Sequence, residues 1–330
     1  MQPDTIENLL AKLPLVKREI QKRIVGQEAA IEQLLLAFIA GGHALLEGVP
    51  GLAKTLMIRT LAEAVHLDFR RIQFTPDLMP TDIIGTEVLQ TDAGTGARSF
   101  QFVQGPIFAN IILADEINRT PPKTQAALLE AMQEFEVTYA GRTYAMAKPF
   151  FILATQNPIE QAGTFPLPEA QLDRFLLYIK IGYPEEEEEL AVLEATTGVE
   201  QANVKAVISA EEIMELQARV REVHISRELM DYVNRLVRAT RPATSGVDFV
   251  REWVQWGAGP RAGQSMILTA KAKALLDGRY AVTPADLRFV AYPVLRHRIL
   301  MNFRADAEGI TSGQVTERLL DVVEIPKGKI

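Results

Sequence analysis

The chain has 330 residues, a formal net charge of −7 and no cysteine, and 48% of its residues are apolar. This length suits one large domain or two ordinary ones, with enough apolar residues for a sizeable core. Without cysteine there is no disulfide and no thiolate metal site, and the negative charge argues against a general nucleic-acid-binding role, which needs a basic surface.

The first residues and the apolar segments predict neither export nor membrane insertion. Residues 1–4 begin acidic and lack the basic-then-apolar pattern of a signal peptide. The longest apolar stretch, residues 34–46, is interrupted by Gly-Gly-His and is too short to span a bilayer. We therefore expect a cytoplasmic protein.

The pattern of apolar residues predicts an α/β fold. Residues 1–40 are typical of helices with a break at Val25-Gly26, and strand-like apolar runs then alternate with helical segments. This alternation favours a parallel sheet with helices on both faces, in which ligands bind outside the carboxyl ends of the strands. The strand-like runs are residues 44–46, 69–74, 111–113, 151–154 and 176–181.

Residues 48–55, which read GVPGLAKT, are close to a phosphate-binding loop between a strand and a helix. A glycine-rich turn there exposes backbone N–H groups, and the helix N-terminus adds partial positive charge. Lys54 would then reach the terminal phosphates, and the Thr55 hydroxyl would bind magnesium. Ala53 replaces the usual glycine, and we expect the turn to tolerate it if its φ angle is negative. The predicted nucleotide contacts in this loop are Gly48, Val49, Pro50, Gly51, Leu52, Ala53, Lys54 and Thr55.

A pair of carboxylates follows the apolar run that begins at residue 111. At the end of a buried strand, Asp115 can hold magnesium and Glu116 can polarise an attacking water. Adjacent strand residues point to opposite sides, which suits two roles at one site. The alternative is a strand that ends in solvated acids.

Three further positions are candidates for contact with a nucleotide. Asn157 follows the strand that ends near residue 155 and can orient the water, although Asn-Pro also starts turns. Arg174, in the string LPEAQLDRF, is a candidate arginine finger for a neighbouring subunit, or else forms an ion pair with Asp173 or Glu169. Arg261 begins a helix after Gly-Pro and can bend back onto the nucleotide, or be an exposed first-turn residue. Arg119 is the second candidate for the finger.

In this order the motifs resemble those of the AAA+ ATPases, and in detail those of the MoxR family. Ala53 is normal for that family, whereas Gly-Ala-Gly-Pro-Arg before and at Arg261 is looser than its usual Gly-Ala-Ser-Pro-Arg. The likeness covers most of residues 25–180 and weakens toward the end. The matching segments are residues 48–55, 74–78, 105–110, 114–119, 154–158 and 167–175.

The resemblance implies an AAA+ αβα parallel-sheet domain over residues 1–184 and a smaller all-α lid over residues 185–330. It also implies that Val25 and Gly26 lie against the adenine. Residues of about 80–105 contain a turn signal and an alternating strand pattern, which predict an inserted hairpin. The resemblance implies that this is the helix-2 insert of one AAA+ clade, which faces a central pore.

Two local patterns complete the expected domain structure. Residues 137–144 predict a second hairpin, which either faces the pore or only connects two elements. In the lid, Ser209 with Glu212 and Thr283 with Asp286 predict capped helix starts.

The resemblance implies an ATPase that binds ATP and Mg²⁺ and hydrolyses ATP at the interfaces of a homo-oligomeric ring, a hexamer. In this interpretation Arg174 contacts the nucleotide of the neighbouring subunit, and Arg261 couples the nucleotide to the lid. The family also implies chaperone-like remodelling or maturation of client proteins that bear von Willebrand factor A domains. A nucleic-acid motor, a chelatase-type ATPase subunit and a nucleotide-gated scaffold are the alternatives on the same fold.

Overall fold

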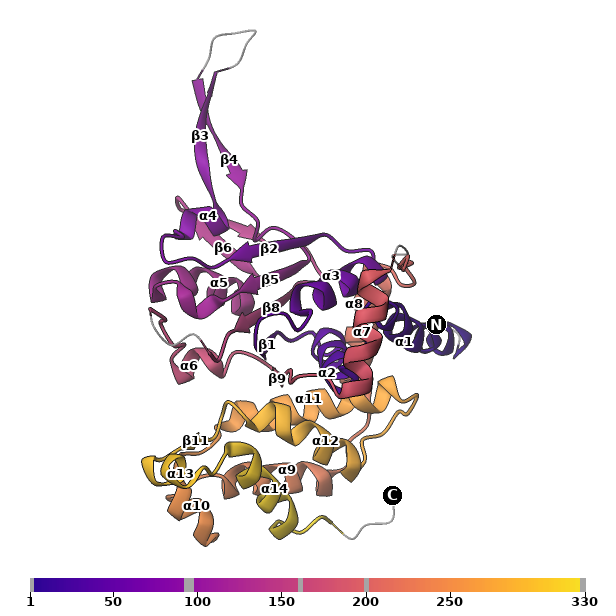
Figure 1. Cartoon of the computed structure of the whole chain (residues 1–330), viewed down its shortest axis with the longest axis vertical. Coiled ribbons are helices and arrows are strands. Elements are labelled where there is room, and N and C mark those ends of the chain that lie inside the picture. The colour runs from indigo at the N-terminus through magenta and orange to yellow at the C-terminus, as the bar shows by residue number, and fades with distance from the viewer. Residues whose placement is uncertain (1–2, 92–97, 160–162, 199–201, 327–330) are drawn as a thin grey trace.

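The computed structural model describes residues 3–91, 98–159, 163–198 and 202–326. Its first part is built on a five-stranded parallel sheet with the order β2-β5-β8-β1-β9 (Figure 1). The predicted α/β fold with a parallel sheet is therefore confirmed. The strands are β1 (Ala44–Glu47), β2 (Phe69–Gln73), β5 (Ile111–Asp115), β8 (Phe151–Gln156) and β9 (Leu177–Lys180).

Successive residues of the central strands face two hydrophobic cores. In β5, Ile111 and Leu113 belong to one core and Ile112 and Ala114 to the other, and all four are fully buried. This alternation is why a parallel strand covered on both faces reads as a continuous apolar run. The helices that complete the two cores are α1 (Pro3–Gln21), α2 (Glu28–Ile39) and α3 (Lys54–Ala64) on one side, and α4 (Pro80–Ile84) and α5 (Pro122–Glu134) on the other.

The parallel pairing separates the loops of the sheet into two edges. Leu46 lies beside Thr155 of β8, so the chain leaves β1 and β8 at the same edge, and β5 ends there too. Ala44 lies beside Leu177, so the segment that enters β9 is at the opposite edge. We call these the carboxyl edge and the amino edge.

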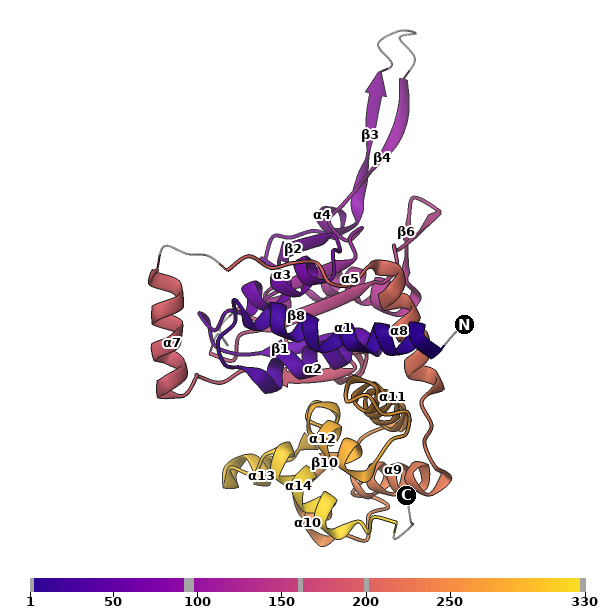
Figure 2. The same ribbon diagram turned by 90° about the vertical axis from the view of Figure 1, so that its right-hand side faces the viewer.

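Two antiparallel hairpins extend from this domain. The first, made by β3 (Gly85–Thr91) and β4 (Arg98–Gln104), projects far from the body (Figure 2). It confirms the predicted inserted hairpin, whose turn signal falls mainly on residues 92–97, outside the described residues. The second, β6 (Glu136–Tyr139) with β7 (Arg142–Ala145), also lies where the sequence predicts it. Phe102 of the first stacks on Tyr144 of the second, with ring centroids 4.3 Å apart.

The second part is helical, as predicted. Both predicted capping boxes are present, at Ser209 with Glu212 and at Thr283 with Asp286. This part also contains a short antiparallel pair, β10 (Val254–Trp256) with β11 (Leu300–Met301), so it is not entirely α-helical. Its helices are α7 (Glu186–Thr197), α8 (Ala210–Glu222), α9 (Arg227–Ala239), α10 (Asp248–Trp253), α11 (Pro260–Leu276), α12 (Pro284–Leu295), α13 (Phe303–Glu308) and α14 (Ser312–Val322).

The lid and the sheet domain share one of the two cores. Leu216 and Val220 of α8 are buried in the same apolar cluster as Leu34 of α2, and Gln217 donates a hydrogen bond of 2.9 Å to the carbonyl of Phe38. Helix α7 stands beside the body, and none of its residues is buried (Figure 2). Among the described helices, none has the length and apolarity needed to cross a bilayer.

Candidate active site

The phosphate-binding loop spans the gap between β1 and α3 at the carboxyl edge of the sheet. Gly51 has φ = 88°, which other residues rarely adopt, and it lets the chain reverse before the helix. Ala53, the residue before the helix, has φ = 53°. The condition set for Ala53, a negative φ angle, is therefore not met, although the turn forms. The tight entry into α3 requires a left-handed residue there, and an alanine in that region costs about 1–2 kcal/mol.

We expect Ala53→Gly to stabilise the unliganded protein by up to about 1 kcal/mol, because glycine removes the left-handed strain but adds entropy to the unfolded chain. Denaturant unfolding measures this as a higher midpoint with an unchanged slope. Ala62→Gly, inside the same helix, is the matched control and should cost about 1 kcal/mol. An equal loss of stability in Ala53→Gly and Ala62→Gly would show that the backbone at Ala53 is not strained.

Lys54 and Thr55 are the first residues of α3, so both side chains start at the carboxyl edge. The Lys54 ammonium donates a hydrogen bond of 2.6 Å to the carbonyl of Gly48 and so lies over its own loop. Burial lowers the pKa of Lys54, while the charges of Asp115 and Glu116 raise it. The lysine predicted to meet phosphate thus lies within electrostatic range of both predicted acids.

Asp115 ends β5 and is buried, with 7% of its surface exposed. The Thr155 hydroxyl donates to its Oδ1 at 2.6 Å, and the Arg71 guanidinium donates twice to its Oδ2, at 3.0 and 2.6 Å. Both partners come from the strands on either side, β8 and β2. The carboxylate is therefore held in one orientation at the carboxyl edge.

Glu116 lies beyond the strand and has φ = 57°. The expectation that both acids lie on the strand is therefore wrong, because β5 ends at Asp115 and Glu116 begins the following turn. Its Oε2 accepts hydrogen bonds of 2.9 Å from Gln73 and from Arg119, and its N–H donates to Thr155 at 2.9 Å. Arg119 thus lies at the carboxyl edge, beside Glu116 of the same chain.

Asn157 directly follows β8 and is buried, with 5% exposed. Its Oδ1 accepts a hydrogen bond of 3.2 Å from the N–H of Ile159, which is the geometry of an Asx turn. The amide nitrogen end of the side chain is the part left for a ligand. The turn and the ligand-binding interpretation are thus compatible at this residue.

Val25 and Gly26 lie in the loop between α1 and α2. Gly26 has φ = 66°, and a Cβ atom at this position would come within 2.5 Å of the Glu188 carboxyl group of α7. Gln27 donates a hydrogen bond of 2.9 Å to the carbonyl of Gly182. The loop predicted to meet adenine is therefore held against the connection from β9 to the lid.

Arg174 and Arg261 lie at the amino edge, away from the loop of their own chain. Arg174 precedes β9 and donates a hydrogen bond of 3.0 Å to the carbonyl of Leu129 in α5. Arg261, in the first turn of α11, has its Nη1 3.8 Å from Oδ2 of Asp173. Both arginines line one cavity of about 250 Å³. The acid beside Arg174 therefore pairs with a lid arginine.

Several residues of this arrangement were not found from the sequence. Thr155 joins Asp115 to Glu116, Arg71 and Gln73 contact the acids, and Arg298 binds the segment around Arg174. Only Thr155 carried a signal, as a polar residue at the end of an apolar strand. The others depend on which strand is adjacent to β5 and on how the lid packs.

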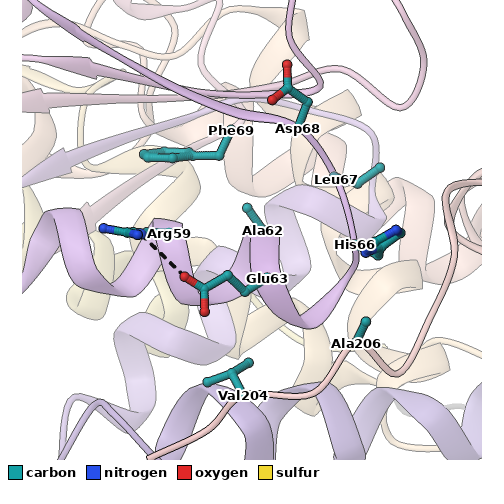
Figure 3. A pocket seen from close by; sticks show the side chains of 9 residues that line it. All are labelled: Arg59, Ala62, Glu63, His66, Leu67, Asp68, Phe69, Val204 and Ala206. Carbon is teal, nitrogen blue, oxygen red and sulfur yellow. Dashed lines mark ion pairs between the residues drawn. The ribbon is translucent and has the colours of Figure 1, made fainter. Parts of the chain in front are cut away.

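A larger cavity, about 640 Å³, lies at the far end of α3 from Lys54 (Figure 3). Arg59 and Glu63 form an ion pair of 3.3 Å on its α3 side, and Val204 and Ala206 face them from the connection to α8. It contains none of the predicted site residues, so it is separate from the candidate active site.

The fold and the site define an ATPase domain with a lid, and comparison with known families agrees. Residues 43–177 match the ATPase family associated with various cellular activities (AAA), and residues 249–319 match the AAA lid domain. Proteins of this class bind and hydrolyse ATP.

Whole-chain relatives define the family further. The chain is 45% identical to "Chaperone MoxR1" of Mycobacterium tuberculosis (strain ATCC 25618 / H37Rv) over 98% of this chain and 86% of that protein. It is 31% identical to "Protein MoxR" of Paracoccus denitrificans over 84% of this chain and 86% of that one. A crystal structure of a protein from Cytophaga hutchinsonii ATCC 33406 has a TM-score of 0.90 and 44% identity, with 98% of both chains covered. The chain belongs to the MoxR family of AAA ATPases, which confirms the resemblance.

Proposed function

We propose that this chain is a magnesium-dependent ATPase that hydrolyses ATP between adjacent subunits of a homo-oligomeric ring. The observation that carries the proposal is the distribution of charge over the sheet. Lys54, Asp115 and Glu116 gather at the carboxyl edge, whereas Arg174 and Arg261 lie at the amino edge.

A subunit cannot complete this site alone. The four residues of β1 put roughly 13 Å of strand between the two edges, at about 3.3 Å per residue. Arg174, which is held against α5, is thus out of reach of a phosphate bound beside Lys54 of the same subunit. A head-to-tail contact, repeated until the ring closes, brings the amino edge of one subunit to the carboxyl edge of the next. We propose six subunits, in the cytoplasm.

Each side chain then has a chemical role in the hydrolysis of ATP. The loop N–H groups and Lys54 bind the phosphates, and Val25 and Gly26 contact the adenine. Glu116 polarises the attacking water, which Asn157 orients. Arg174 and Arg261 of the neighbour neutralise the charge that develops on the transferred phosphoryl group. In this assignment Arg261 serves the nucleotide of the adjacent subunit and not of its own.

Thr55 and Asp115 would hold the magnesium ion, which supplies further positive charge to the phosphates. Within residues 3–91, 98–159, 163–198 and 202–326, no group of three or more His, Cys, Asp or Glu can hold a metal ion. One carboxylate and one hydroxyl suit Mg²⁺, because this ion usually takes its remaining ligands from phosphate and water.

The experiment that tests the nucleotide site is Lys54→Ala. We expect ATP binding to be lost, because the bound phosphates lose the charge-assisted contact of the loop lysine. Isothermal calorimetry with ATP measures the affinity, and Arg59→Ala, an exposed cation on the same helix, is the control that should bind normally. An unchanged affinity in Lys54→Ala would refute the nucleotide site.

We expect Asp115→Ala to weaken ATP binding only when magnesium is present, because the substitution removes the metal ligand but not the phosphate contacts. ATP titrations with magnesium and with a chelator measure the difference. Thr155→Val is the control for the lost hydrogen bond to Asp115. An equal loss with and without magnesium would contradict the metal role.

We further propose that the ATPase cycle remodels or matures partner proteins, among them ones with von Willebrand factor A domains. The support is the similarity to a relative named as a chaperone, at 45% identity over nearly the whole chain. A pull-down with Glu116→Gln and ATP tests it, because a ring that binds but does not hydrolyse should retain its client. Stimulation of the ATPase by DNA or RNA, without client capture, would instead support the nucleic-acid motor.

A further inference from the structure

Arg298 is a buried arginine that attaches the lid to the segment carrying Arg174. Only 5% of its surface is exposed, although the residue carries a charge. Its Nε donates to Oδ1 of Asp173 at 2.7 Å, and its Nη2 donates to the carbonyls of Asp173 at 3.2 Å and Phe175 at 2.7 Å. It therefore binds the backbone on both sides of Arg174.

The same guanidinium also reaches the helix that carries Arg261. Its Nη2 lies 3.2 Å from the Ser265 hydroxyl, one turn further along α11. Asp173 completes the connection, because its second oxygen faces Arg261 at 3.8 Å while its first binds Arg298. Arg298 and Asp173 thus connect the two arginines of the amino edge.

Stability alone is a poor explanation for this buried charge. Removing a guanidinium from water is costly, and apolar residues of similar volume often stabilise a fold equally well or better. What the charge adds is a fixed geometry, since five N–H donors in a rigid fork orient the backbone they bind. The groups oriented here are those on either side of a predicted finger.

We propose that Arg298 is a positioning residue for the active site of the neighbouring subunit. It holds the side chains of Arg174 and Arg261 in fixed positions at the amino edge. Through these two arginines, the packing of the lid in one subunit controls hydrolysis in the adjacent subunit. This inference rests on the proposed function, because it requires ATP bound between subunits. It goes beyond that function by making the lid contact of one subunit a condition for its neighbour's catalysis.

The first measurement separates positioning from binding. We expect Arg298→Gln to bind ATP with unchanged affinity but to turn over about 10²-fold more slowly, the size of effect that a misplaced catalytic group produces. Arg296→Gln is the matched control. Arg296 comes from the same turn of the lid and donates a hydrogen bond of 2.8 Å to the carbonyl of Tyr178 in β9, away from Arg174. Its loss should lower the melting temperature with little change in turnover. Equal loss of turnover in both variants would overturn the proposal.

The second measurement tests which subunit is affected. Arg298→Gln co-assembled with inactive Lys54→Ala should regain activity, because some sites combine an intact Lys54 with a neighbour that has an intact Arg298. Co-assembly of Arg298→Gln with Arg174→Ala should regain none, because both changes damage the same edge. No recovery with Lys54→Ala, while Arg174→Ala does recover with it, would place the effect of Arg298 in its own subunit and overturn the inference alone. No recovery for either would overturn the proposed function.

If Arg298→Gln does not fold, Asp173→Asn takes its place. This substitution keeps the shape of the side chain and removes only its charge, so it weakens the contacts to Arg298 and Arg261 together. It should show the same pattern of recovery on mixing. Turnover like that of Arg296→Gln would overturn the proposal.

Discussion

Arg174→Ala is expected to fold and to bind ATP, yet to hydrolyse it roughly 10³-fold more slowly, the lower end of the effect of an arginine finger. The physical reason is that charge develops on the transferred phosphoryl group, and a cation from the neighbouring subunit stabilises it only in the transition state. Steady-state phosphate release, together with ATP affinity, measures the two effects separately.

Mixing variants tests whether Arg174 acts between subunits. Co-assembled with inactive Lys54→Ala, it should restore activity at roughly a quarter of the interfaces in a randomly mixed head-to-tail ring. A structural arginine predicts a lower melting temperature and no recovery. Arg119→Ala is the comparison, because Arg119 pairs with its own Glu116 at 2.9 Å and lies at the carboxyl edge. Recovery for Arg119→Ala but not for Arg174→Ala would show that Arg119 is the finger and leave the ring unaffected. If neither variant recovers and the protein stays monomeric in ATP, the ring itself is refuted.

Glu116→Gln is expected to bind ATP and magnesium with near-normal affinity but to lose about 10²–10⁴-fold in turnover, the usual contribution of a general base. An amide cannot take up the proton of water as a carboxylate does. The side chain keeps its length, so its place beside Gln73 and Arg119 is retained. A pre-steady-state measurement of bound-nucleotide hydrolysis checks the chemical step directly.

Glu130→Gln is the control for this result, since Glu130 is an exposed acid on α5 of the same domain. It should hydrolyse ATP at the normal rate. If Glu116→Gln also turns over normally, the base is a different residue. If it loses ATP binding as well, the substitution has disturbed the site as a whole, and the assignment of Glu116 as the base fails.

The sequence by itself determined which segments form the strands of the sheet, the loops at their ends and the starts of several helices. Buried parallel strands must be apolar on both faces, so a run such as residues 111–114 is recognisable without knowing its neighbours. The free backbone N–H groups at a helix N-terminus are likewise hydrogen-bonded by residues close in the chain. The capping boxes at Ser209 and Thr283 were therefore predictable. The phosphate-binding loop was predictable for the same reason, because the residues expected to bind phosphate lie at eight consecutive positions.

Only the tertiary structure decided which distant residues meet. Asp173 and Arg298 are 125 positions apart, and they are joined because the lid packs on the entry to β9. The turn at Glu116 and the left-handed angle at Ala53 are imposed by the layout of the carboxyl edge, against the local preference of those residues. Whether an arginine serves its own nucleotide or its neighbour's depends on the edge of the sheet at which it lies. For Arg174 the sequence already favoured the neighbour, but for Arg261 it favoured the nucleotide of its own subunit. Strand pairing and the packing of the lid place Arg261 beside Arg174 at the amino edge, and the sequence does not show that packing.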